Sequence, residues 1–119
     1  MQTVKTAPAT PGAVLAKVRL PTTLSAKAAG GQTYYDAACA SCHGKNAAGQ
    51  DGIAPPLVHQ IYQPSHHGDA AFLVAVRKGA RQHHWSIGSM LPVQKKLTDG
   101  EIAAITLYVR ELQRENGTM

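Results

Sequence analysis

Both cysteines of this 119-residue chain lie within five consecutive residues, the run Cys39-Ala40-Ser41-Cys42-His43. A disulfide redox pair at this spacing normally follows a β-strand and opens a helix, and no strand is predicted before Cys39. A zinc site would need two further ligands at short spacing, and the chain has no convincing second pair. Covalent haem attachment needs only this run, because the two thiols form thioether links to the porphyrin vinyl groups and the next His lies under the iron. Of the three interpretations, haem attachment is the one that the spacing favours.

The amino-acid composition agrees with a fold built around a bound group. A mass of 12.6 kDa allows one compact domain. Apolar residues make up 44% of the chain, but its aromatic residues are only one Phe, one Trp and four Tyr. A chain this short with so few bulky side chains does not easily close a core unaided. We therefore expect a non-protein group to fill its centre.

The start of the chain bears on where the protein resides. Its longest apolar run is far shorter than the roughly 20 residues that span a bilayer, so no integral membrane segment is predicted. The first 20 residues contain Lys5, Lys17 and Arg19 and no apolar stretch typical of a secretory leader. Thioether attachment in bacteria takes place outside the cytosol. We therefore expect a periplasmic protein whose leader has already been removed.

The formal net charge of +5 is unevenly distributed. Residues 1–29 contain four cations and no carboxylate, whereas residues 30–119 contain eight cations and seven carboxylates. Every charged side chain between Asp69 and Asp99 is basic, which predicts docking to redox partner proteins with an acidic face, or in the simpler interpretation only solubility. Nucleic acid is not expected as a partner, because only Trp85 interleaves with these cations. The basic residues of this segment are Arg77, Lys78, Arg81, Lys95 and Lys96.

The chain divides into two parts by composition. Alanine, threonine and proline dominate its first 24 residues. We expect residues 1–29 to form an extended N-terminal arm or linker and residues 30–119 to form the folded domain. Within the arm, Val14, Val18 and Leu20 are apolar enough to lie along the body of the fold.

The first predicted helix begins after Ser25, a favourable N-cap, and runs to about Ser41. Gly30 and Gly31 inside it cost about 1 kcal/mol each relative to Ala, which indicates a close contact with another helix. Residues 44–67 contain glycine and proline breakers and no sustained period, so they are a predicted loop.

Two further helices are predicted before the C-terminus. Asp69 is the expected cap of a short helix that ends at Gly79, and residues 80–97 form another loop. Thr98 and Glu101 have the spacing of a capping box and open the last helix, which ends at Asn116-Gly117. Nothing alternates with period two over a useful length, so the predicted fold is all-α, with three principal helices. The expected buried stripe of the last helix is Ile102, Ile105, Tyr108 or Val109, and Leu112.

Over residues 30–113 the sequence resembles class I cytochrome c. The intervals of four between Gly31, Tyr35 and Cys39 are similar to the first helix of that family, where glycine lets the last helix cross closely, and Tyr108 occupies the matching aromatic position. Two loops are similar as well. They are Ala54-Pro55-Pro56-Leu57, with Ala where the family has Gly, and Ser89-Met90-Leu91-Pro92, with Leu inserted in the family's Met-Pro pair.

The resemblance implies one covalent haem c with two axial ligands. His43 is the first, and the family places its second ring nitrogen against a proline-loop carbonyl, here that of Pro55. Met90 is the expected ligand on the opposite side, since it is the one internal Met and thioether sulfur binds iron well. The alternatives are His83 or His84 as the sixth ligand, with Met90 as an ordinary apolar residue.

Other side chains have less specific expectations. The indole N–H of Trp85 is expected to donate to a haem propionate, as in small bacterial cytochromes c, unless Trp85 only packs. Arg77 and Arg81 either neutralise propionates or form a solvated helix face. Three loop histidines are expected at the surface rather than at a second metal ion: His59, His66 and His67.

The resemblance implies one-electron transfer by a periplasmic electron carrier of a respiratory or photosynthetic chain, and not an enzyme. Two alternatives stay open. The chain is instead an electron-entry subunit or excised domain of a larger oxidoreductase, which its basic arm favours, or a haem-based sensor or gas binder, which requires a vacant or weakly held sixth position.

Overall fold

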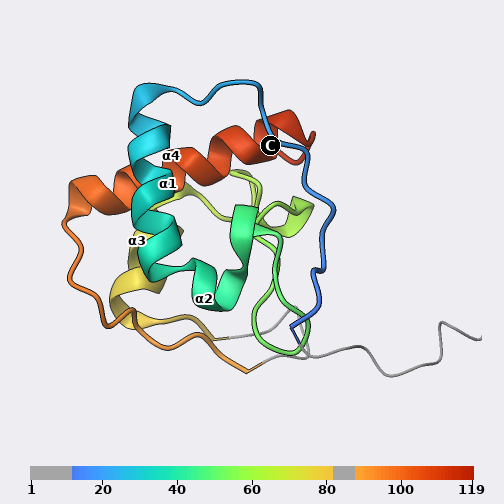
Figure 1. Cartoon of the computed structure of the whole chain (residues 1–119). Coiled ribbons are helices and arrows are strands. Elements are labelled where there is room, and N and C mark those ends of the chain that lie inside the picture. Colours follow the sequence, from blue (N-terminus) through green and yellow to red (C-terminus); the bar gives the residue numbers. More distant parts are fainter. Residues whose placement is uncertain (1–11, 82–87) are drawn as a thin grey trace, which may run out of the picture.

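The structure is a computed structural model that describes residues 12–81 and 88–119. Its α-helices are α1 (Ala26–Ala38), α2 (Ala40–His43), α3 (Asp69–Lys78) and α4 (Asp99–Glu115), with 3-10 helices at Lys45–Ala47 and Gln60–Tyr62 (Figure 1). The described part of the chain has isolated β-bridges but no strand, so the predicted all-α fold with three main helices is confirmed. No helix in the described ranges is long and apolar enough to cross a membrane.

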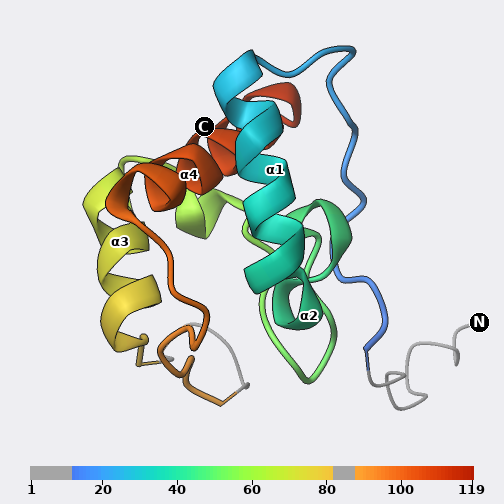
Figure 2. The same cartoon turned by 60° about the vertical axis from the view of Figure 1, so that its left-hand side comes forward.

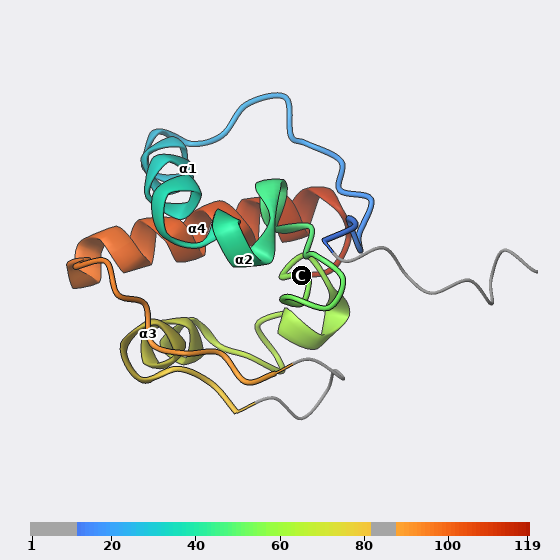
Figure 3. The same cartoon turned by 60° about the horizontal axis from the view of Figure 1, so that its bottom comes forward.

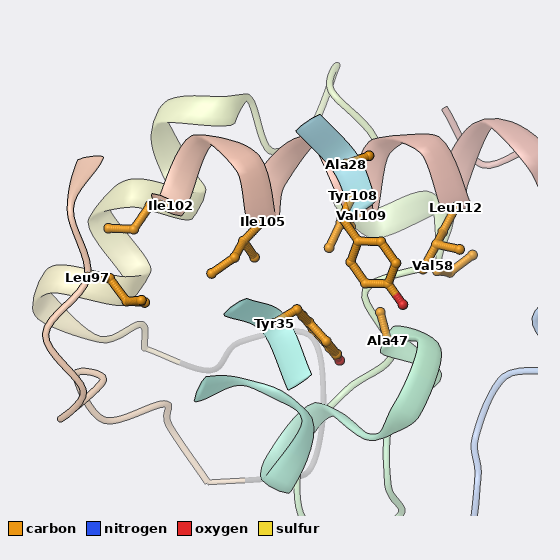
Figure 4. Packing of buried hydrophobic residues seen from close by; sticks show 10 residues of the cluster. All are labelled: Ala28, Tyr35, Ala47, Val58, Leu97, Ile102, Ile105, Tyr108, Val109 and Leu112. Carbon is orange, nitrogen blue, oxygen red and sulfur yellow. The ribbon is translucent and has the colours of Figure 1, made fainter. Parts of the chain in front are cut away.

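Helices α1 and α4 cross each other and form the centre of the core (Figure 2). A Cβ atom on Gly31 would overlap the backbone of Ala104, so glycine is required where the two helices touch. Gly30 has open space around it, and the expected close contact at Gly30 is therefore wrong. The buried face of α4 follows the predicted stripe, with both Tyr108 and Val109 inside it (Figure 4).

Two of the predicted helix ends are confirmed and two others differ in the structure. The Ser25 cap of α1 and the Thr98–Glu101 capping box of α4 are both present, as predicted. Helix α1 ends at Ala38 rather than near Ser41, because Cys39 leaves helical geometry and α2 begins after it. The N-cap of α3 is Gly68, so the expected capping role of Asp69 is wrong. The carboxylate of Asp69 binds an arginine of α4 instead.

Residues 12–24 run along the outside of the helices (Figure 1). The Ala16 amide donates to Ala48 at 2.9 Å, and Gly12 and Asp51 are joined by a backbone hydrogen bond. At the far end of this segment, the Arg19 amide donates to the Asn116 side chain at 2.8 Å. The described part of the arm therefore ties the loop after α2 to the end of α4.

Helix α3 differs from α1 and α4 because none of its residues is buried. Its apolar residues Phe72, Leu73 and Val76 are half-buried against the edge of the core. Figure 3 shows α2 and α3 as separate elements on the same side of α4. This arrangement leaves apolar side chains of α3 without full cover from the protein itself.

Candidate haem site

Cys39 is the residue at which α1 ends and α2 begins, and Cys42 lies within α2. Cys39 is half-buried, Cys42 is exposed, and both thiols are free. Burial, and then the neighbouring Cys42, raise the pKa of the Cys39 thiol to about 11. A redox-active thiol needs the opposite shift, because its thiolate is the reactive form. This pKa and the absence of a strand from the described residues argue against a disulfide redox pair.

Zinc is disfavoured by the arrangement of possible ligands. Among residues 12–81 and 88–119, no group of three or more His, Cys, Asp or Glu side chains is placed to hold a metal ion. His59 instead accepts the Ile61 amide at 3.1 Å, and His67 contacts the Ile61 carbonyl and the Tyr62 ring. His66 is exposed, as expected, whereas His59 and His67 are half-buried and their ring nitrogens contact the backbone of their own loop.

The imidazole of His43 is held in one tautomer by Pro55. Its Nδ1 atom lies 2.9 Å from the Pro55 carbonyl oxygen, and the residue as a whole is 9% exposed. A carbonyl only accepts, so Nδ1 carries the proton and Nε2 presents a lone pair. Burial lowers the pKa of His43, against the opposing effect of the Pro55 hydrogen bond, and this favours the neutral ring that metal binding requires. The hydrogen bond expected from the family resemblance is therefore present.

The loop that carries Pro55 is attached directly to α2. The Gly49 amide donates to the His43 carbonyl at 2.6 Å, and a Cβ atom on Gly49 would overlap the backbone of Pro56. The Gln50 side-chain amide donates to the carbonyls of Ser41 and Cys42, at 2.9 and 3.1 Å. The sequence analysis singled out neither Gly49 nor Gln50. No local pattern shows that the backbone of residue 49 approaches Pro56, or that the side chain of residue 50 satisfies the carbonyl groups at the end of α2.

Met90 lies in the segment that follows α3 and is fastened to the end of that helix. The Met90 amide donates to the Ala80 carbonyl at 2.8 Å, and the Ala80 amide donates back at 3.0 Å. Gly79 has a φ of +81°, and a Cβ atom there would overlap the Met90 carbonyl oxygen. Gly79 therefore ends α3, as predicted, and also lets the Met90 backbone approach.

The structure describes only some of the remaining predicted site residues. Trp85, His83 and His84 lie outside the described residues. Arg77 forms an ion pair with Asp99 at 2.6 Å, so its charge is largely compensated within the protein.

The residues fit a covalently bound haem. Two free thiols for attachment, with a neutral imidazole and a Met thioether as iron ligands, are the groups that c-type haems use. Half-buried apolar side chains at the edge of the core would supply the dry surroundings that a porphyrin needs. They include Ala38, Leu57, Phe72, Leu73, Val76 and Val93.

The comparisons with known proteins agree with this fit. Residues 28–113 match the family model described as cytochrome c. The chain is 37% identical over 95 residues to a "Cbb3-type cytochrome c oxidase subunit CcoP" of Azospirillum brasilense, and 38% identical over 92 residues to the protein of that name in Azospirillum sp. (strain B510). The matches cover 74% and 72% of this chain, which spans 29% of the length of either relative.

No solved structure is a significant match to this chain. The residues that the family model matches nevertheless include the C-x-x-C-H run, the crossing of α1 with α4 and the Met90 segment. Members of this family hold haem c covalently through that run. The chain, with a fixed imidazole at His43 and free thiols at Cys39 and Cys42, belongs to the cytochrome c family.

Proposed function

We propose that this chain transfers single electrons through one haem c, attached by Cys39 and Cys42 and ligated by His43 and Met90. The observation that carries this proposal is the 2.9 Å hydrogen bond that orients the His43 ring from the carbonyl of Pro55. The haem supplies the exchange between Fe(III) and Fe(II). The protein orients the imidazole, holds the thioether segment against α3 and surrounds the group with apolar side chains, which limits reorganisation during transfer.

Absorption spectroscopy of the purified holoprotein tests the ligand assignment. The ferric protein should show the weak far-red band that is specific to Met–Fe ligation, and its denatured mass should include one haem. Met90→Ala should keep the haem attached, lower the reduction potential and bind cyanide or imidazole faster, because no thioether must be displaced. An unchanged low-spin spectrum and potential in Met90→Ala would show that another residue is the sixth ligand.

The role we propose for the chain is that of a periplasmic electron carrier. The compartment is supported by the chemistry of attachment, which bacteria carry out outside the cytosol. A fixed Met90 segment, joined to α3 by two hydrogen bonds with Ala80, supports electron transfer over sensing, which requires a weakly held sixth position.

A second role is favoured by the relatives. Both are named as subunits of a cbb3-type oxidase and are much longer than this chain, so this domain is alternatively the electron-entry part of a larger oxidoreductase. The two roles differ in whether the chain binds the oxidase at a constant ratio and whether it dissociates between electron transfers. A carrier purifies alone and oxidises or reduces its partner in bimolecular steps that saturate with concentration, whereas a subunit co-purifies with the oxidase at a constant ratio.

The proposed partner presents an acidic face to the segment that contains Met90. Lys78, Lys95 and Lys96 are exposed on or beside this segment. Basic side chains near the site of transfer steer an acidic partner and raise its association rate by 10- to roughly 1000-fold at low salt. Lys95→Glu with Lys96→Glu should therefore slow the bimolecular rate and flatten its salt dependence. Lys5→Glu with Lys17→Glu is the matched control, and equal slowing by both pairs would indicate total charge as the determinant.

A further inference from the structure

Arg110 is a buried cation on α4 whose hydrogen bonds converge from three segments. Its side chain is 5% exposed, and Nε donates to Asp69 Oδ1 at 2.9 Å. Nη1 donates to the Tyr62 carbonyl and to Gln113 Oε1, at 2.7 and 2.8 Å, and Nη2 donates to the His67 carbonyl. The guanidinium carbon also lies 4.8 Å from the centre of the Phe72 ring.

These contacts make Arg110 costly to disturb. A buried guanidinium is tolerated because most of its five N–H groups are satisfied, and removing one partner leaves a charge without its full compensation. Its carboxylate partner is the first residue of α3, whose own side chain is 74% exposed. The pair therefore joins a fixed point in α4 to the beginning of α3.

Helix α3 is otherwise held by the packing of half-buried Phe72, Leu73 and Val76 against the core and by a second ion pair. None of its residues is buried, and its last turn is tied to α4 by the Arg77–Asp99 pair, in which both side chains are at least 40% exposed. Exposed ion pairs contribute about 0–1 kcal/mol, so the pair with buried Arg110 is the stronger of the two ion pairs.

The C-terminal end of α3 carries the Met90 segment. Ala80 and Met90 exchange backbone hydrogen bonds, and the Val93 amide donates to the Val76 carbonyl at 3.0 Å. A displacement of α3 therefore moves Met90 with it. A continuous set of contacts runs from Arg110 through Asp69 and α3 to Met90.

We propose that Arg110 is a positioning residue for the sixth haem ligand, because through Asp69 it fixes the helix to which Met90 is attached. This inference rests on the proposed function, in which Met90 binds the iron. Weakening the Arg110–Asp69 pair lets α3 and Met90 open together, while the α1–α4 core and the His43 side keep their structure.

The test uses holoprotein variants and the rate at which cyanide binds the ferric haem. Asp69→Asn is chosen because Asp69 is exposed and asparagine keeps an oxygen that can accept from Arg110. We expect cyanide binding to accelerate about fivefold and the far-red Met–Fe band to weaken, since a charged hydrogen bond becomes a neutral one. Glu115→Gln removes the same charge from an exposed position at the end of α4 and should leave the rate unchanged.

Arg110→Lys is the second variant, because lysine keeps the charge but lacks the planar fork that reaches several partners. It should accelerate cyanide binding at least as much, and adding Asp69→Asn to it should have little further effect. In the Met90→Ala background, Asp69→Asn should not change the rate, because no thioether remains to be released.

Two failures are distinguishable. If the wild type lacks the far-red band and binds cyanide as fast as Met90→Ala, the assignment of Met90, and with it the proposed function, is wrong. If Met90→Ala accelerates binding but Asp69→Asn and Arg110→Lys leave the rate at the wild-type value, the positioning role of Arg110 is refuted. An acceleration by Asp69→Asn that persists in Met90→Ala also refutes it.

Discussion

The rings of Tyr35 on α1 and Tyr108 on α4 pack with their centroids 5.4 Å apart and their planes at 53° (Figure 4). The Tyr35 hydroxyl donates to the Gly44 carbonyl at 2.7 Å, directly after the C-x-x-C-H run. The buried Tyr108 hydroxyl has no partner among the described residues. The two tyrosine rings pack against each other, but only the Tyr35 hydroxyl contributes a hydrogen bond to the stability of the fold.

Replacing each tyrosine by phenylalanine should show this difference. Tyr35→Phe should lower the free energy of unfolding by about 1–3 kcal/mol, because the buried Gly44 carbonyl loses its donor. Tyr108→Phe should leave it unchanged or raise it, because a buried hydroxyl without a partner is removed. Denaturant titration of the two holoproteins measures both values. Equal losses from the two variants would contradict the assignment of the Tyr35 hydrogen bond.

Ionisation of Tyr108 should lower the stability of the protein at alkaline pH. Burial, with a contribution from Asp36, raises the pKa of Tyr108 from 10.0 to about 12. The unfolded chain then loses this proton first, so the contribution is fully present below pH 10 and is lost as pH rises from 10 to about 12. Tyr108→Phe should lessen the decline of unfolding free energy over that window. Identical pH profiles for wild type and variant would exclude Tyr108 as a source of the decline.

The haem should be required for folding. The described core contains few large side chains, and a buried haem adds apolar contact worth roughly 10 kcal/mol, comparable with the whole stability of a small domain. Cys39→Ser with Cys42→Ser should therefore give a largely unfolded chain by far-ultraviolet circular dichroism. A native-like helical spectrum without haem would show that the protein core suffices.

The crossing of α1 and α4 should tolerate no side chain at one glycine and accept one at its neighbour. Gly31→Ala should destabilise the holoprotein by roughly 3 kcal/mol or more, because the new methyl group overlaps the Ala104 backbone. Gly30→Ala is the control, and its open surroundings should let alanine stabilise α1 by up to about 1 kcal/mol. Thermal unfolding of both variants measures the difference, and a similar midpoint for the two would contradict the close approach.

Gly79 should affect the sixth ligand where another glycine with a similar φ does not. Gly79 and Gly52 have φ values of +81° and +77°, so alanine strains the backbone at both, by roughly 1–3 kcal/mol. Only at Gly79 does the methyl group also overlap the Met90 carbonyl. Gly79→Ala should weaken the far-red Met–Fe band and lower the potential, and Gly52→Ala should leave both unchanged. Equal spectra would show that Met90 is held independently of Gly79.

Much of this protein is determined by patterns within a few residues. The Ser25 cap, the Thr98–Glu101 box and the apolar stripe of α4 predict most helix boundaries correctly, and the Cys39–His43 run predicts the family that the chain belongs to. They do so because capping and helical periodicity act between residues at most four positions apart.

The rest was decided by contacts between residues that are distant in sequence. Helical propensity does not distinguish Gly31 from Gly30; the family resemblance pointed to Gly31, and the packing of α4 against α1 gives the physical reason. Aspartate is a residue type that often caps helices. The carboxylate of Asp69 instead accepts from buried Arg110, 41 residues later in the chain, and does not cap its own helix. A buried cation gains more from a carboxylate than a helix end does, because the alternative for the cation is an uncompensated charge in a low-dielectric interior.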